Sequence, residues 1–279
     1  ALFWGGSYLL MDISLTEVET FNLNALRFIS AFLIALVVTF KKIKNVNRIT
    51  IKYAAFIGFI LMFVYIGATY GVQYTSLSNT GFLCSLTVVI TPILGFFFKG
   101  QKPEKKLIIV VIMALIGIAL LTLNDQLRPA LGDILCIMCA FAYAIHLLVI
   151  ETAVQKEGVN AFQLGVFQLG FAGLYQLIIS FLIETPHFPT TPKVWISVIV
   201  LSIFCTGLAF IIQTVAQQYT SASHVGVIFT SEPVFAGLVA FFIAGEVLSI
   251  RAYIGAVILL CSILIMELDF RKITGKIRR

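Results

Sequence analysis

The chain has 279 residues, of which 60% are hydrophobic and only 11% are charged, and its mean hydropathy is +1.04. Soluble domains hold about 45–50% apolar and about 25% charged residues, so this composition excludes an ordinary soluble fold, a disordered chain and a nucleic-acid-binding module. The net charge of +6 comes from Lys and Arg residues that cluster in short segments between apolar runs, which is a pattern of membrane topology. The sequence therefore predicts a polytopic membrane protein.

Apolar runs recur along the whole chain at the length that a membrane requires. A helix needs about 20 apolar residues to span a hydrocarbon core of about 30 Å. The first run, Ala1–Met11, is short, and we expect it to be the remainder of a longer helix, because no basic segment or small-residue cleavage site marks it as a signal peptide. The expected fold is an all-α membrane protein with ten transmembrane helices. The other nine runs lie at 21–40, 51–72, 76–98, 106–123, 131–150, 161–183, 194–217, 222–243 and 250–268.

The distribution of basic residues predicts which helix ends face the cytoplasm. If both termini are inside, fifteen Lys and Arg residues fall in inner segments, among them those of a basic tail at 269–279. Only Arg128, Lys193 and Arg251 then fall in outer segments, and the first outer loop, residues 12–19, is acidic. By the positive-inside rule, we expect a multi-pass protein of the cell's cytoplasmic (inner) membrane with both termini in the cytoplasm.

An internal repeat divides the chain into two halves. A shift of 145 residues aligns residues 74–123 with residues 219–268 without a gap, and thirteen of the fifty pairs are identical. The match opens with YTSLSNTGFL against YTSASHVGVI, whose shared polar residues do not follow from apolar composition. Two halves of five helices face opposite ways because five is odd. We therefore expect two inverted repeats, 1–123 and 130–268, an arrangement by which many secondary transporters build one site that opens to either side.

Three stretches resemble the EamA type of the drug/metabolite transporter superfamily. They are ALFWGGSYLL at the start, ALRF at 25–28 and EPVFAGLVAFFIAGE from Glu232 to Glu246. The resemblance covers nearly the whole chain and implies ten helices in two repeats, and a bacterial inner-membrane exporter of small metabolites, often amino acids. The sequence departs from the family pattern at Gln101, which stands where Glu246 stands in the second repeat, and at Tyr143, where a Trp is common. Motif-level similarity in so broad a family does not identify the cargo.

Polar side chains at membrane depth are costly, so each one marks a candidate site. Polar and aromatic residues share helix faces in several of the predicted helices, where they serve either as hydrogen-bonding links between helices or as the lining of a cavity. Taken as a set, they predict a central cavity that binds a small, neutral or zwitterionic solute. The expected substrate-binding residues are Trp4, Tyr8, Tyr65, Asn79, Tyr143, His146, Gln213 and His224.

Two charged residues lie within predicted helices, and each one has either a role in ion or substrate coupling or a structural role. Arg27 either contacts an anion, or extends toward the outer surface and pairs with the acidic loop before it. Glu232 either binds a proton, a cation or a substrate ammonium group, or satisfies backbone groups that Pro233 frees. Glu246 closes the same helix and is expected to be a cap or lock at the loop end.

Other classes of function have less support. The three histidines lack metal-ligand spacing, no P-loop is present, and Cys136-x-x-Cys139 lacks a second ligand pair. We therefore expect no enzyme, no metal and no cofactor. A channel would need a filter segment or a pore-lining ring, and none is visible. The predicted function is secondary transport of a small polar metabolite, an amino acid or related zwitterion, with export favoured and a monomer sufficient. The alternative is a multidrug or cation exporter that uses Glu232.

Overall fold

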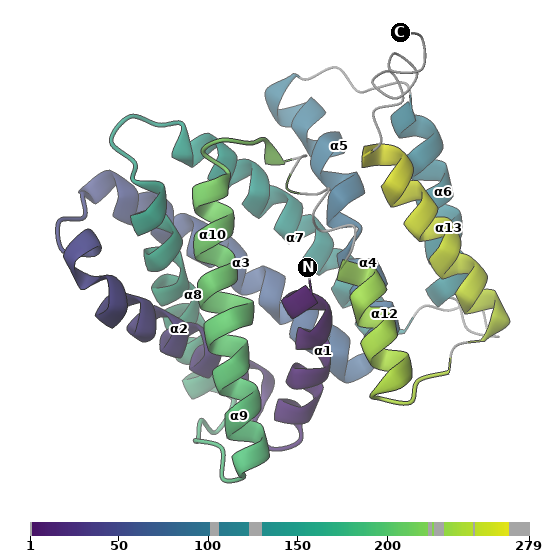
Figure 1. Ribbon diagram of the computed structural model, residues 1–279, viewed down its shortest axis with the longest axis horizontal. Coiled ribbons are helices and arrows are strands. Elements are labelled where there is room, and N and C mark those ends of the chain that lie inside the picture. Colours follow the sequence, from purple (N-terminus) through teal and green to yellow (C-terminus); the bar gives the residue numbers. More distant parts are fainter. Residues whose placement is uncertain are drawn as a thin grey trace, which may run out of the picture.

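The computed structural model describes residues 2–100, 106–122, 130–222, 225, 232–247 and 249–267. Within these residues all the regular structure is helical (Figure 1). All ten predicted apolar runs contain helix, so the prediction of an all-α chain is confirmed for the part described. The helices are α1 (Leu2–Leu15), α2 (Thr20–Ile43), α3 (Arg48–Tyr74), α4 (Leu77–Cys84), α5 (Thr87–Lys99), α6 (Lys106–Thr122), α7 (Leu131–Val154), α8 (Ala161–Ile183), α9 (Pro192–Val200), η1 (Leu201–Leu208), α10 (Ala209–Ala216), α12 (Glu232–Phe242) and α13 (Ile250–Glu267).

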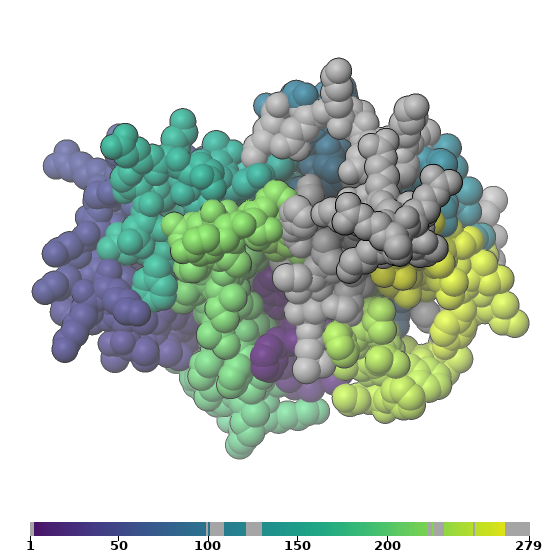
Figure 2. All heavy atoms as spheres, turned by 45° about the horizontal axis from the view of Figure 1, so that its top comes forward, coloured from purple at the N-terminus to yellow at the C-terminus, as the bar shows by residue number. Residues whose placement is uncertain are grey.

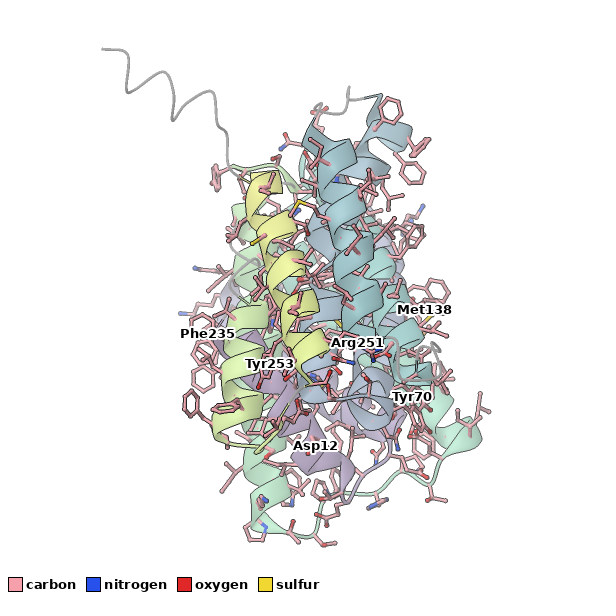
Figure 3. All side chains as sticks on the ribbon, turned by 90° about the vertical axis from the view of Figure 1, so that its right-hand side faces the viewer. Asp12, Tyr70, Met138, Phe235, Arg251 and Tyr253 are labelled. Atoms are coloured by element: carbon pink, nitrogen blue, oxygen red, sulfur yellow. The ribbon has the colours of Figure 1, made fainter. Side chains whose placement is uncertain are left out.

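Length and apolar composition make many of these helices suitable for a bilayer. Among the described residues, six helical stretches are long and apolar enough to cross a membrane: Thr20–Ile43, Arg48–Tyr74, Leu77–Phe98, Leu131–Val154, Ala161–Ile183 and Pro192–Ala216. Three shorter apolar helices accompany them. Apolar side chains project outward from the bundle, as Figure 3 shows along α12, where Phe235 lies at one edge, and along α7, where Met138 lies at the other. These outward faces are suited to contact with lipid.

Polar residues fix where several helices begin. The side chains of Asn47, Ser76 and Asn160 precede α3, α4 and α8, and each accepts a hydrogen bond from the backbone N–H three residues later, at 2.8, 3.1 and 3.0 Å. Such caps satisfy N–H groups that the first helical turn leaves without partners. Pro192 begins α9, where its missing N–H costs nothing.

Glycines allow the helices to approach one another closely. A Cβ atom on Gly67 of α3 would lie 2.6 Å from the Leu135 carbonyl oxygen of α7, and one on Gly58 would lie 2.8 Å from the Phe171 Cβ of α8. The α6–α13 pair meets in the same way at Gly117. Small residues are what membrane helices use for tight packing, because lipid provides no hydrophobic force between helices.

The helix α1 occupies the middle of the bundle. It packs against α12 on one side and against α9 and η1 on the other, and Figure 2 shows it set deep between α10 and α12. Most of the buried apolar residues form one core cluster that extends from α1 through α3, α4, α7 and η1 to α13. The middle of this cluster contains the polar groups described below.

The α-helical geometry is interrupted at two places that border the middle of this core cluster. The apolar run that contains α4 and α5 is broken at Ser85 and Leu86, between Cys84 and Thr87. In the span from α9 to α10, residues Leu201–Leu208 form a π-helix, η1. Such helical breaks and π segments occur preferentially at functional sites.

Candidate functional site

A cavity of about 50 Å³ lies where α1, α3, the α4–α5 break, α7, α10 and α12 meet. This volume is room for a few water molecules. The lining combines aromatic rings, hydroxyl groups, thiols and one carboxylate. It consists of Trp4, Ser7, Tyr8, Met11, Val64, Tyr65, Ala68, Cys84, Ser85, Thr87, Val88, Cys139, Tyr143, Phe210 and Glu232.

The break between α4 and α5 provides two of the hydroxyl groups of this lining, those of Ser85 and Thr87. The Ser85 hydroxyl donates to the Gly81 carbonyl at 2.7 Å, and the Thr87 hydroxyl contacts the carbonyls of Cys84 at 2.8 Å and of Ala140 at 3.2 Å. These bonds satisfy carbonyl groups in and beside an interrupted helix, which a membrane interior requires. The chain is thereby stable in a tightened turn beside the cavity, in which Ser85 and Leu86 keep right-handed helical dihedral angles.

Glu232 is the carboxylate of the cavity. It stands in the first turn of α12 with 8% of its surface exposed, and its Oε1 accepts a hydrogen bond of 2.6 Å from the Tyr8 hydroxyl of α1. Gly5 of α1 allows this approach, because a Cβ there would lie 2.9 Å from the Glu232 carbonyl oxygen. The pair leaves carboxylate lone pairs that a cationic or hydrogen-bonding solute could occupy.

The π-helix holds the aromatic wall of the cavity. The Trp4 indole N–H donates to the Cys205 carbonyl of η1 at 2.7 Å. The Trp4 ring then packs edge-on against Tyr143 and at a tilt against Phe210, with ring centroids 6.1 and 5.5 Å apart. Phe210 also packs against Tyr65. Rings in these arrangements give a rigid apolar surface with polar groups at its edge.

A hydrogen-bonded layer stands behind this wall. The Tyr143 hydroxyl donates to Gln213 Oε1 at 2.8 Å, and the Gln213 amide approaches Gln217 Oε1 at 3.4 Å. His146 Nε2 lies 3.1 Å from Gln168 Oε1, and the Gln168 amide donates to Thr214 at 2.8 Å. Buried polar networks of this kind fix side-chain orientations when their members are satisfied.

Arg27 lies beside the cavity rather than at the surface. It is fully buried in α2, seven residues after the helix begins, which is about 10 Å along the axis. Its Nε donates to Thr206 Oγ1 of η1 at 2.9 Å, and its Nη1 lies 3.2 Å from Met11 Sδ. Of the two alternatives for Arg27, the extension toward the outer surface is therefore wrong. The side chain is enclosed because η1 and α1 pack over this part of α2.

The predicted site residues fall into three groups. Trp4, Tyr8, Tyr65 and Tyr143 line the cavity with Glu232. His146 and Gln213 do not line it, but each contacts Tyr143, by ring packing or by a hydrogen bond. His224 lies outside the described residues.

Asn79 is not at the cavity, contrary to expectation. Its amide nitrogen lies 3.2 Å from Asp133 Oδ1 and 3.3 Å from Thr75 Oγ1, at the ends of α3, α4 and α7. It stands in the first turn of α4, whereas the cavity touches this part of the chain only from Cys84, the last residue of that helix, onward. Its side-chain amide links the end of α3 to the beginning of α7.

The sequence interpretation missed the groups of the α4–α5 break. Ser85 and Thr87 lie in an apolar run that reads as one continuous helix. A signal was present, because the 145-residue shift pairs Thr87 with Glu232, and both residues line the cavity and begin helices.

Carboxylates also join the loops at the lower end of the bundle in Figure 1, which we call the carboxylate end. Glu184 accepts the backbone N–H groups of Phe21 and Asn22, at 2.9 and 2.8 Å, where α2 begins. Glu246 accepts those of Leu77 and Ser78, at 2.6 and 3.1 Å, where α4 begins. An acid at a helix N-terminus satisfies free donors and interacts favourably with the helix dipole. Glu246 is therefore a cap, but the helix that it caps is α4 and not α12, the helix that it follows in the chain.

Glu17 and His187 continue this carboxylate end. Glu17 accepts hydrogen bonds from Thr190 and from the backbone and hydroxyl of Thr191, and the donors lower its pKa to about 2. His187 contacts the carbonyls of Thr185 at 2.9 Å and of Glu17 at 3.0 Å, and these acceptors raise its pKa. The loop after α1 is thereby joined to the loop after α8.

No group of three His, Cys, Asp or Glu residues that could hold a metal ion occurs among the described residues. The chemistry that this arrangement offers is binding by hydrogen bonds, ring contacts and one carboxylate. Comparison with known families then decides the class. The model of the EamA-like transporter family matches residues 1–123 and again residues 130–268. The chain belongs to this family. It is a multi-pass membrane transporter, as its resemblance to the EamA type implied.

Relatives of similar length agree with this membership. A protein of Archaeoglobus fulgidus, an uncharacterized transporter, is 28% identical over 96% of this chain and 83% of its own length. The uncharacterized transporter YetK of Bacillus subtilis is 27% identical, over 90% of this chain and 79% of its own. A solved crystal structure with 16% identity covers 98% of this chain and 95% of that one with a TM-score of 0.72, which shows the shared fold.

Proposed function

We propose that this EamA-family transporter moves a small zwitterion, an amino acid or a close relative, out of the cell by alternating access. The observation that carries the proposal is the cavity at the helix breaks, where rings, hydroxyl groups and a single carboxylate converge. Neutral hydrogen bonds and one carboxylate suit an ammonium-bearing solute, and the rings suit an apolar side chain.

Features shared by the two halves support an inverted repeat, residues 1–123 and 130–268. Gly100 after α5 and Gly245 after α12 are equivalent under the 145-residue shift, and both adopt left-handed backbone, with φ of 64° and 70°. Their helices α5 and α12 run in opposite directions (Figure 1). Thr87 and Glu232 form a second equivalent pair that meets at one cavity. An inverted repeat with its site at the helix breaks is a common transporter plan.

The size of the cavity and the bonds at the carboxylate end support alternation. About 50 Å³ admits a few waters, so a metabolite enters only after the surrounding helices separate. In the orientation with both termini cytoplasmic, the carboxylate end faces outward, because it holds the loop between α1 and α2. The proposed conformation is therefore one in which the outer loops are joined and the solute path is closed on that side.

Counterflow in proteoliposomes tests this function. Vesicles that contain the purified protein are loaded with each of the twenty amino acids, and uptake of the same labelled amino acid is followed. A carrier of amino acids gives saturable uptake that the internal amino acid accelerates. Uptake of none of them, or flux that rises linearly with concentration without acceleration, contradicts the proposal.

Glu232 supports a second candidate, export of lipophilic cations or drugs. A carboxylate within an aromatic cavity attracts a delocalised cation as well as an ammonium group. The same vesicles are therefore also tested with tetraphenylphosphonium. Uptake of this cation with no uptake of amino acids would favour the second candidate.

A further inference from the structure

Arg27 is a buried positive charge without an anionic partner among the described residues. Its exposed fraction is 0%. Its Nε and Nη1 contact a hydroxyl and a thioether, those of Thr206 and Met11, which are both neutral. Its Nη2 is buried and has no hydrogen-bond partner. A guanidinium has five N–H donors in a planar fork, and here only two of its three nitrogens have partners.

The surroundings compensate this charge only in part. The guanidinium carbon lies 4.5 Å from the centroid of the Tyr65 ring and 5.8 Å from that of Phe28. Cation–π contacts are favourable, but they are weaker than pairing with a carboxylate. If packing were the only role of Arg27, an apolar side chain of similar volume would serve as well or better, because a charge without a partner is costly to bury.

Arg27 lies behind side chains that line the cavity. Two of the side chains that contact the guanidinium, Met11 and Tyr65, line the cavity. Methionine is unbranched and has three rotatable bonds, so it changes rotamer readily. A rotation of Met11 away from Nη1 would open the guanidinium to the cavity, to which α12 contributes the carboxylate of Glu232.

We propose that Arg27 is the carboxylate-binding subsite of the transport cavity. The inference rests on the proposed function and deepens it, since Glu232 then receives the ammonium group of the same zwitterion. The planar fork of Arg27 binds the carboxylate through two parallel N–H···O bonds. The subsite selects solutes that bear a carboxylate over their amides and amines.

The test measures binding with a reporter in the cavity wall. The chain has two tryptophans, and Trp4 lines the cavity, so a Trp195→Phe background leaves Trp4 as the only tryptophan. Its emission is titrated with three probes that share one apolar group: L-leucine, L-leucinamide, which lacks the carboxylate, and 4-methylpentanoate, which lacks the ammonium group. The variants are Arg27→Gln, Arg27→Met and the control Gln176→Met. Gln176 is also buried with a polar atom that has no partner, but it does not line the cavity.

The subsite predicts a selective loss of affinity. Arg27→Gln and Arg27→Met should weaken the carboxylate probes about 10- to 150-fold, the range for a hydrogen bond to a charged group. Both should leave leucinamide within about 2-fold of the background protein. Gln176→Met should not alter the preference among the probes. Arg27→Met should also fold with an unchanged or raised melting temperature in the absence of ligand, because it removes an unpaired buried charge.

The outcomes separate the subsite from the transported substrate. Binding of 4-methylpentanoate that depends on Arg27, without transport of any amino acid, leaves the subsite standing and rejects the proposed function. The subsite is rejected if no carboxylate probe binds the background protein. Equal effects of the Arg27 variants on all three probes, or the absence of any effect, also reject it. Failure of Arg27→Met to fold would assign the residue a structural role and overturn the proposal.

Discussion

At the residue scale, the site depends on a small number of polar contacts in an apolar bundle. Glu232 is central, because it is the carboxylate of the cavity and it holds Tyr8 of another helix at 2.6 Å. A substitution that removes the charge of Glu232 but retains its shape tests which of the two properties binding requires.

Glu232→Gln retains an oxygen that accepts from Tyr8 and removes the charge. We expect affinity for ammonium-bearing solutes to fall about 10- to 150-fold, the equivalent of about 1.5–3 kcal/mol for a hydrogen bond to a charged group. Titration of Trp4 emission measures the change. Glu157→Gln, the same substitution in an exposed loop, serves as the control. Equal affinity of wild type and Glu232→Gln for every ammonium-bearing solute would remove the carboxylate from the site.

Tyr143 and Gln213 act as a bonded pair, at 2.8 Å. Replacing either one by Ala should weaken binding by about 0.5–1.5 kcal/mol, or about 2- to 13-fold. The double variant should cost less than the sum of the two, because each single change already breaks the shared bond. Ser262→Ala, in α13 and bonded only to the Leu259 carbonyl, is the control. Strict additivity would show that the pair is not coupled.

At the element scale, the close contact between α1 and α12 positions Glu232. A Cβ atom on Gly5 would lie 2.6 Å from the Phe235 Cβ, whereas a Cβ on Gly6 would meet nothing within 4 Å. Gly5→Ala should therefore destabilise the protein by about 1–3 kcal/mol through overpacking. Gly6→Ala should be neutral or stabilising by up to about 1 kcal/mol, because Ala favours helix over Gly. Thermal unfolding in detergent measures both, and equal melting temperatures would contradict the close packing of these helices.

The loops of the carboxylate end should loosen at both low and high pH. The pKa of Glu17 is lowered from 4.5 to about 2, so its contribution is complete above about pH 4.5 and is lost as the pH falls toward 2. The pKa of His187 is raised from 6.5 by carbonyl acceptors and by the charges of Glu17 and Glu19, so its contribution is complete below about pH 6.5 and is lost as the pH rises through the higher value.

Hydrogen exchange of residues 184–191 measures this dependence. Protection should be greatest between about pH 4.5 and 6.5, after correction for intrinsic exchange rates. Glu17→Gln should remove the acidic limb, and His187→Asn should remove the alkaline one. A profile that is unchanged by both substitutions would show that these groups do not hold the loops together.

At the scale of the whole molecule, hydropathy and charge were enough to predict the helices but not their interruptions. The run at 76–98 contains no charged residue, so its hydropathy did not separate α4 from α5, and Ser85 and Thr87 were missed. For Arg27 the sequence left open an anion contact or an extension toward the outer surface, because the residue lies close to the acidic loop, yet η1 and α1 enclose it. The 145-residue shift pairs Asn79 with His224, and both were assigned to the cavity, but Asn79 lies in the first turn of α4 and the cavity begins at Cys84, at the other end of that helix. Tertiary packing determines where the helices are interrupted and which polar side chains face the cavity, and a local stretch of sequence does not give that packing.

The central claim is that one cavity becomes accessible from each side of the membrane in turn. A variant that retains Cys139 of the cavity wall as its only cysteine tests it most directly, in vesicles that present a known face to a membrane-impermeant thiol reagent. We predict labelling from either face, with saturating transported solute slowing both reactions. Labelling from one face alone, under all solute conditions, would contradict alternating access at this site.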